Sequence, residues 1–150
     1  MIQARWFIGG DDCGDALMIR RRVFIEEQCI DEDVEMDGKD AEALHLVVYD
    51  GERPVATGRM RLVDNQALIG RVAVLEEERG KGYGDFAMRV LIWQAAEMRY
   101  DRQIVHAQLE VAGFYKKLGF KPVGEEYEEA GITHITMVRE GGAESCRISP

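Results

Sequence analysis

The chain has 150 residues, 46% of them hydrophobic, and its 28 acidic and 19 basic residues give a formal net charge of −9 at pH 7. This length suits one domain with one hydrophobic core, and the negative field argues against DNA or RNA as a partner. No apolar run is long enough to cross a membrane and no basic-then-apolar leader begins the chain, so we expect a cytoplasmic protein without membrane contact.

Hydrophobic periodicity predicts a chain of alternating elements, which we take in order. The first half is expected to hold a strand over Ile2 to Ile8, a helix over Asp15 to Glu27, a long acidic connector, and strands over Ala43 to Tyr49, Pro54 to Val63 and Ala67 to Leu75. The second half is expected to hold a helix over Asp85 to Arg99, a strand over Gln103 to Gln108, a helix over Val111 to Leu118, and strands over Lys121 to Glu128 and His134 to Arg139.

The turns between these elements predict how the strands pair. Asp50-Gly51 and Asp64-Asn65 are typical hairpin turns and favour antiparallel neighbours, whereas the long helix after Leu75 predicts a parallel crossover. The tail from Glu140 to Pro150 is aperiodic, and we expect a frayed end there.

Three cysteines, Cys13, Cys29 and Cys146, are an odd number and lack C-x-x-C spacing. This pattern argues against a disulfide framework and against a zinc site, so we expect reduced thiols and no metal.

The segment Arg79-Gly80-Lys81-Gly82-Tyr83-Gly84 follows a predicted buried strand and precedes a predicted helix. A helix N-terminus presents unpaired N–H groups and partial positive charge, and glycines let a phosphate approach these donors closely. No Ser or Thr follows Lys81, which excludes a nucleotide P-loop, and the glycine spacing differs from the dinucleotide fingerprint G-x-G-x-x-G. The segment therefore predicts a phosphate site of another kind.

The pattern R-x-x-G-x-G formed by Arg79, Gly82 and Gly84 resembles the acetyl-CoA loop of the GNAT superfamily of N-acetyltransferases. A second segment, Gly113 to Phe120, is similar to the Y-x-x-x-G-F signature of that superfamily. Residues 21–28 and 37–45 resemble a small bacterial branch of it, ElaA-like or YjcF-like. The resemblance covers most of residues 1–140.

The resemblance implies an α/β (α+β) fold: one GNAT-like domain over residues 1–140 and a flexible tail over 141–150. Its sheet would be mixed, mostly antiparallel and twisted, flanked by helices and splayed at the acetyl-CoA site. The implied activity is acetyl transfer from acetyl-CoA, as co-substrate, to a primary amine by direct attack in a ternary complex. Two alternatives stay open: an acyl-CoA-binding regulatory module without catalysis, and a transferase that uses a longer acyl-CoA.

By the same resemblance, the cofactor-binding residues come from the strand before the loop, the loop itself, and the second motif. Gln108 stands where many members of the superfamily carry Asn, so its contact departs from the usual pattern. The implied set is Val72, Ala73, Val74, Arg79, Gly80, Lys81, Gly82, Tyr83, Gly84, Gln108, Phe114, Tyr115 and Lys117.

The resemblance assigns Tyr115 as the general acid, since a phenol with a pKa near 10 is protonated at pH 7 and can donate to a leaving thiolate. Glu26, Glu27 and His45 are the candidates for the general base, because they lie in segments expected to border the acceptor cleft. We expect His106 and His134 to pack rather than react. Cys29 has no adjacent histidine in the sequence to activate it, which favours direct attack over an acyl-enzyme.

The stretch from Glu26 to Glu42 holds nine acidic residues opposed only by Lys39. It suggests either a small cationic amine as acceptor or an ordinary solvated loop. The partner expected from the whole sequence is thus a small-molecule amine, and a homodimer is left open.

Overall fold

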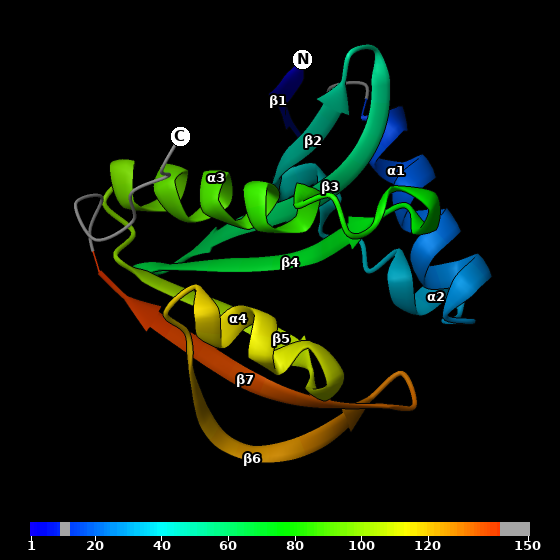
Figure 1. The fold of residues 1–150 in the computed structure, drawn as a ribbon. Helices are drawn as coiled ribbons and strands as arrows, with labels where there is room; N and C mark the ends of the chain where they lie inside the picture. The colour runs from blue at the N-terminus through cyan, green and yellow to red at the C-terminus, as the bar shows by residue number, and fades with distance from the viewer. Residues whose placement is uncertain (10–12, 142–150) are drawn as a thin grey trace.

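The structure, a computed structural model, describes residues 1–9 and 13–141. In this part of the chain seven strands form one sheet, in the order β1-β2-β3-β4-β5-β7-β6 (Figure 1). The strands are β1 (Ile2–Ile8), β2 (Leu44–Asp50), β3 (Arg53–Val63), β4 (Gln66–Val74), β5 (Arg102–Gln108), β6 (Lys121–Glu129) and β7 (Ile132–Glu140). The helices are α1 (Gly14–Arg20), η1 (Arg21–Glu27), α2 (Glu32–Glu35), η2 (Asp40–Glu42), η3 (Glu76–Glu78), α3 (Tyr83–Glu97), η4 (Leu109–Val111) and α4 (Ala112–Lys117).

The predicted strands are confirmed, each end within two residues of its expected position. The first predicted helix is in fact two segments, because η1 is a π-helix in which the Gln28 N–H donates to the Val23 carbonyl five residues earlier. The acidic connector is not a plain loop, since it contains α2 and η2. Residues 142–150, where the tail was predicted, lie outside the described residues.

Strand pairing follows the turn chemistry. Strands β1 to β4 form an antiparallel meander, α3 carries the chain across to β5, which pairs with β4 in parallel, and β7 and β6 complete the sheet antiparallel. The predicted mixed and mostly antiparallel sheet is therefore confirmed. In the described part of the chain, no helix is long and apolar enough to cross a membrane.

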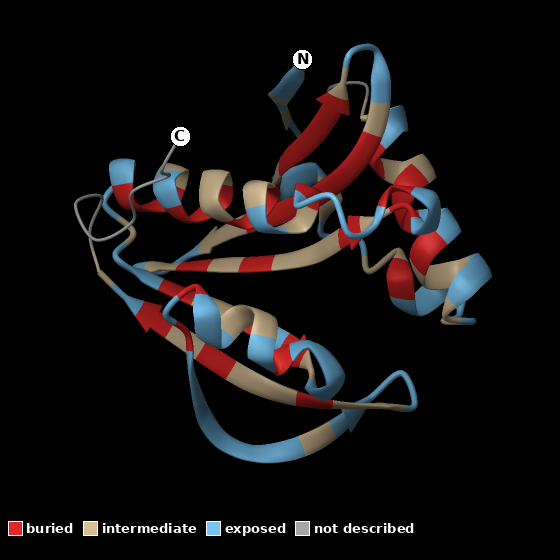
Figure 2. Ribbon diagram, in the orientation of Figure 1, coloured by how far each residue is buried: buried red, intermediate tan, exposed pale blue. Residues whose placement is uncertain are grey.

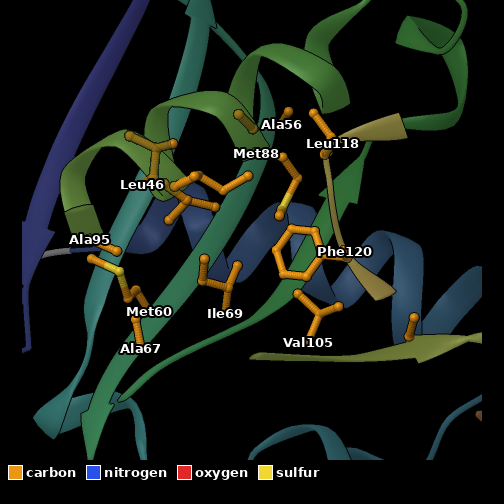
Figure 3. Close-up of a cluster of buried hydrophobic side chains, with 14 of the residues drawn as sticks. Leu46, Ala56, Met60, Ala67, Ile69, Met88, Ala95, Val105, Leu118 and Phe120 are labelled. Carbon is orange, nitrogen blue, oxygen red and sulfur yellow. The ribbon is translucent and has the colours of Figure 1, made fainter. Parts of the chain in front are cut away.

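Helices cover both faces of the N-terminal strands, and side-chain alternation along β2 shows why. Leu46 and Val48 belong to the core cluster that contains Leu91 of α3, whereas Val47 and Tyr49 belong to a second cluster with residues of α1. Figure 2 shows β2 and β3 buried along most of their length, and Figure 3 shows the larger cluster between α3 and the sheet. Strand β6 is an exposed edge.

The sheet opens between β4 and β5, as predicted. Their parallel ladder pairs residues 66–69 with residues 102–105 and then ends, although β4 continues to Val74 and β5 to Gln108. Figure 1 shows the two strands diverging beyond this point. The backbone groups of both strands beyond the ladder are thus available to a molecule placed between them.

A β-bulge in β4 accompanies the opening. The register with β3 shifts so that Gly58 lies opposite both Arg71 and Val72, and Arg71 adopts a left-handed φ of +51°. Gly58 packs closely against α3, because a Cβ there would lie 2.6 Å from Cδ1 of Leu91 and this side chain would have to shift. The bulge bends β4 away from β5 where the ladder ends.

Candidate active site

A cleft of about 810 Å³ occupies the opening between β4 and β5 and continues over the neighbouring face of the sheet. Its walls come from β3 and β4 on one side, from β5 and the β6–β7 turn on the other, and from η1 and the acidic connector. This volume is within the range for small-molecule sites. The site is therefore built from segments that are far apart in the sequence.

The glycine loop meets α3 beside this opening. Gly80 and Gly82 have left-handed φ angles of +81° and +85°, Gly82 is the N-cap residue of α3, and no side chain caps this end of the helix. A Cβ added at either glycine would meet nothing within 4 Å. The first N–H groups of this 15-residue helix thus have no side-chain cap, the arrangement that binds phosphate in proteins.

The two cations of the loop are held by carboxylates. The guanidinium of Arg79 donates to both oxygens of Glu27, at 2.7 and 2.8 Å, and its Nε donates to the Val74 carbonyl at 3.1 Å. The Lys81 ammonium lies 3.3 Å from Glu78. Hydrogen bonds from Arg79 lower the pKa of Glu27 below its ordinary value, which makes this carboxylate a weak base.

Tyr115 projects from α4 into the cleft. Its ring packs edge-on against Phe114 and Phe120, with centroids 5.1 and 5.9 Å away, and its hydroxyl makes no hydrogen bond to any other described residue. Burial raises the pKa of Tyr115 to about 12, so the phenol is protonated at physiological pH. A held, protonated hydroxyl at the cleft wall is what a proton donor requires.

Gln108 spans the cleft at its open end. Its side-chain amide donates to Oε1 of Gln28, on the loop after η1, at 2.9 Å. This bond links the C-terminal half of the sheet to the N-terminal helical layer, and the remaining amide groups of both side chains stay available to a ligand.

The structure brings together some of the residues predicted from sequence and not others. Those that line the cleft are Val72, Ala73, Val74, Arg79, Gln108 and Tyr115. Those outside its lining are Gly80, Lys81, Gly82, Tyr83, Gly84, Phe114 and Lys117, which lie on the glycine loop, the first turn of α3 and α4. Tyr83 is buried, with its hydroxyl donating to Asp50 at 2.9 Å.

The structure does not place two candidates for the general base in the cleft. His45 is 1% exposed on β2, where Nε2 lies 3.0 Å from the Asp40 carbonyl, and Glu26 is exposed on η1 outside the cleft lining. Both residues were predicted as candidates for the general base because they are close in sequence to the acidic connector. Strand alternation buries His45, and the turn of η1 directs Glu27 rather than Glu26 toward the cleft.

Two histidines that were expected to pack rather than react also line the cleft. His106 on β5 has Nδ1 3.0 Å from the hydroxyl of Tyr127 and 3.2 Å from that of Thr136, while His134 on β7 bonds through Nδ1 to the Ile132 carbonyl at 2.7 Å. The signal for His106 was present in the sequence, because alternation along β5 puts it on the same face as Gln108.

Comparison with known protein families shows to which family the chain belongs. The sequence model of the acetyltransferase (GNAT) domain matches residues 11–140, nearly the whole chain. The chain belongs to the GNAT family. By this membership it is an acyltransferase of the acetyl-CoA-dependent type.

Individual relatives agree with this assignment of the GNAT domain. The chain is 38% identical over 127 residues to a Bacillus subtilis protein named as uncharacterised N-acetyltransferase YjcF, covering 84% of this chain and 91% of that one. It superimposes on the crystal structure of Escherichia coli ElaA with a TM-score of 0.84 and 30% identity, covering 93% of this chain and 100% of ElaA. An acetyl-CoA-bound GNAT acetyltransferase from Elizabethkingia anophelis shares the fold at 15% identity, with a TM-score of 0.71 over 93% of this chain and 97% of that one.

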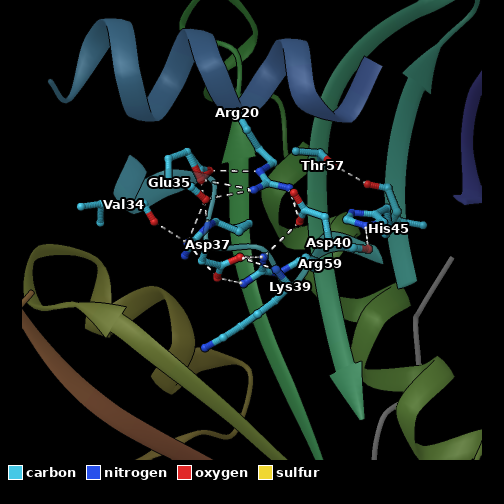
Figure 4. A network of polar contacts seen from close by, with 11 residues as sticks. Arg20, Val34, Glu35, Asp37, Lys39, Asp40, His45, Thr57 and Arg59 are labelled. Carbon is cyan, nitrogen blue, oxygen red and sulfur yellow. Dashed lines mark hydrogen bonds and ion pairs between the residues drawn. The ribbon is translucent and has the colours of Figure 1, made fainter. Parts of the chain in front are cut away.

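In this GNAT domain a closed ring of ion pairs ties the acidic connector to the sheet (Figure 4). Three arginines from α1, β3 and β4 alternate with three carboxylates of the connector, each separated by 2.8 to 3.2 Å from its neighbours. The ring runs through Arg20, Glu35, Arg71, Asp37, Arg59 and Asp40. With Glu27 and Glu32 also paired, five of the nine acids of the segment are neutralised, so its charge is largely internal.

The ring predicts an acid-sensitive fold. Burial opposes ionisation of Asp37, but hydrogen bonds from Arg59 and the Lys39 amide, and the charge of Arg71, outweigh it and lower the Asp37 pKa well below 3.8. The stabilisation is therefore complete above about pH 4 and is lost as the pH falls below that value. Asp37→Asn is expected to cost about 1–3 kcal/mol in the free energy of unfolding at pH 7, measured by urea denaturation, and to flatten its pH dependence.

The matched control for Asp37 is Asp33→Asn, in the same acidic segment. Asp33 is exposed and has no ion-pair partner among the described residues. Its variant should unfold like the wild type at every pH. Equal losses in the two variants would contradict a stabilising role of the ring.

Proposed function

We propose that this protein transfers the acetyl group of acetyl-CoA to a primary amine by direct attack within a ternary complex. The observation that carries the proposal is the opening between β4 and β5 beside the uncapped N-terminus of α3. The opening offers a slot lined by strand amides that no other strand pairs with. The N-terminus of α3 offers uncapped helix amides for a diphosphate. The acetyl-CoA bound in the Elizabethkingia anophelis protein of the same fold supports this choice of donor.

In the proposed reaction the diphosphate binds to the backbone amides of residues 80–84. The pantetheine arm lies between β4 and β5, against Val72 and Val74, and a β4 amide near Val74 stabilises the oxyanion as the amine adds to the thioester. The C–S bond then breaks, the nitrogen releases a proton to water, and Tyr115 donates its proton to the departing thiolate and is reprotonated from water. These roles agree with the position and protonation of Tyr115 but are part of the proposal.

Calorimetry with CoA and acetyl-CoA, followed by thiol release with a panel of amines, tests the proposal. We expect a dissociation constant on the order of 10 µM for acetyl-CoA and amine-dependent thiol release with one N-acetyl product per thiol. A series of longer acyl-CoA donors measures the preference for acetyl.

Each alternative has its own result. Absence of heat on titration, with no bound molecule in native mass spectra, would contradict the proposal. Binding of acetyl-CoA without thiol release from any amine would favour a regulatory module, and faster transfer of a longer acyl group would favour a different donor.

A further inference from the structure

Most of the charged side chains that line the cleft form ion pairs. The unpaired ones are separated by sign, with the cations on one wall and the carboxylates on the other. Arg59, Arg71 and Arg79 are paired with carboxylates, as are Glu27, Glu35 and Asp37. Among the described lining residues, four charged side chains have no Lys, Arg, Asp or Glu partner: Lys39 and Arg61 on one wall, and Glu110 and Glu129 on the other.

We propose that the acceptor is an amino-carboxylate, whose carboxylate binds Arg61 and Lys39 and whose amine lies beside His106, His134 and Glu129. The proposal rests on the proposed acetyl transfer and names the class of its second substrate. It replaces the purely cationic acceptor suggested by the acidic stretch, because the structure neutralises five of those nine acids internally.

Arg61 is the decisive residue. It lies on β3 two residues after Arg59, which is bound by Asp37 and Asp40, yet Arg61 has no ion pair among the described residues and its Nε is buried without a hydrogen-bond partner. The Nε atom is shielded, whereas the two Nη groups are not among the buried atoms and make no hydrogen bond to a described residue, so they are the donors that a ligand carboxylate can reach. A planar guanidinium matches a carboxylate in shape and charge.

Lys39 supplies a second cation on the same wall. It follows Asp37 in the connector, and Figure 4 shows its side chain extending away from the ring of ion pairs. Burial lowers the pKa of His106, Glu129 opposes this effect, and the charges of His134 and Lys39 add to it. Lys39 and His106 both line the cleft.

The opposite wall is suited to an amine. A carbonyl oxygen only accepts hydrogen bonds, so the bond from His134 to Ile132 places the proton of the neutral ring on Nδ1 and leaves Nε2 as an acceptor. Nε2 lies 3.8 Å from Glu129, and the Tyr127 ring stacks on the imidazole at 5.8 Å. A carboxylate attracts the ammonium form, and a neutral imidazole can accept its proton.

Strand register sets the separation of the two walls. Arg61 pairs with Leu68, which pairs with Ile104, two residues before His106. With strand spacing of about 4.8 Å and a rise of about 3.3 Å per residue, the Cα atoms of Arg61 and His106 are at least about 12 Å apart, because the strands diverge after Val105. Both side chains stand on the same face of the sheet and line the cleft, at a separation that suits a small molecule with an ammonium at one end and a carboxylate at the other.

The test compares matched ligands on the wild type and on Arg61→Gln, with CoA-saturated and CoA-free protein. The ligands are a series of ω-amino acids, the corresponding alkylamines, the corresponding fatty acids, and aminoalkyl phosphates, titrated by NMR and then assayed for thiol release. We expect the ω-amino acid that fits to bind at least ten-fold more tightly than its alkylamine, with the same gain in kcat/KM. This gain should vanish in Arg61→Gln and persist in Lys121→Gln, a control on the exposed strand β6.

The possible results separate this inference from the acetyl transfer. Acetylation of alkylamines with no gain from a carboxylate, or a gain that survives Arg61→Gln, would overturn the acceptor class and leave the transferase intact. A larger gain from a phosphate would overturn carboxylate in favour of a phosphate monoester. Binding of the fatty acids to CoA-free protein tests the carboxylate site at Arg61 and Lys39 even if acetyl-CoA does not bind. Should Arg61→Gln fail to fold, Arg61→Lys provides a variant that keeps the positive charge.

Discussion

Tyr115→Phe is expected to lower kcat for acetyl transfer by about ten- to ten-thousand-fold while the affinity for CoA stays the same. The ring sits between Phe114 and Phe120, so removing one oxygen leaves the packing in place. Burial raises the pKa of the phenol to about 12, so the wild type carries a proton on this oxygen at any pH used for the assay. The measurement is steady-state thiol release with an amine that the wild type acetylates, alongside calorimetry with CoA.

Tyr100→Phe is the matched control for this experiment. Tyr100 is also half-buried against the larger core cluster, but it does not line the cleft, and its hydroxyl has no hydrogen bond within the described residues. Its variant should keep wild-type kinetics. If both variants keep full activity and lose the same stability, Tyr115 only packs.

Gly82→Val is expected to weaken CoA binding at least about 100-fold, equivalent to about 2.7 kcal/mol. Gly82 has a left-handed φ of +85°, and its Cβ would enter the open space in front of the first turn of α3. A branched side chain there would meet the phosphate oxygens before they reach the helix amides, and it would strain the N-cap. Calorimetry with CoA measures the change.

Backbone strain alone must be separated from loss of the phosphate site. Gly124 provides the comparison, because its φ of +78° is nearly the same, a Cβ there also meets nothing within 4 Å, and it lies on β6 outside the cleft. Gly124→Val should lose similar stability in thermal unfolding but bind CoA normally. Normal binding by Gly82→Val would remove the glycine loop from the cofactor site.

Contiguous features of the site were accessible from sequence. The glycine loop, the strand before it and the tyrosine motif are each short runs of neighbouring residues, and the turn chemistry of Asp50-Gly51 and Asp64-Asn65 predicted the hairpins correctly. The π-helical register of η1 was missed, because a helical pattern of apolar residues does not distinguish four-residue from five-residue hydrogen bonding.

The side of the cleft proposed to bind the acceptor was largely inaccessible from sequence. Arg61, His106 and His134 lie on three different strands, and only the sheet register places them around one space. Likewise, the acids of the connector looked like a ligand-attracting surface, although five of the nine pair with arginines, three of them with arginines from α1, β3 and β4. Counting charged residues gives the sign of a segment's net charge but does not identify the side chains that neutralise it.

The sequence by itself determined the family, the order of the strands along the chain and the position of the glycine loop proposed to bind phosphate, because these depend on local spacing and on helix and turn chemistry. The tertiary structure alone decided how far the ladder between β4 and β5 runs, which acids remain unpaired and which side chains line the cleft. Those properties depend on strand register and on ion pairs between residues distant in the sequence, and no local pattern encodes them.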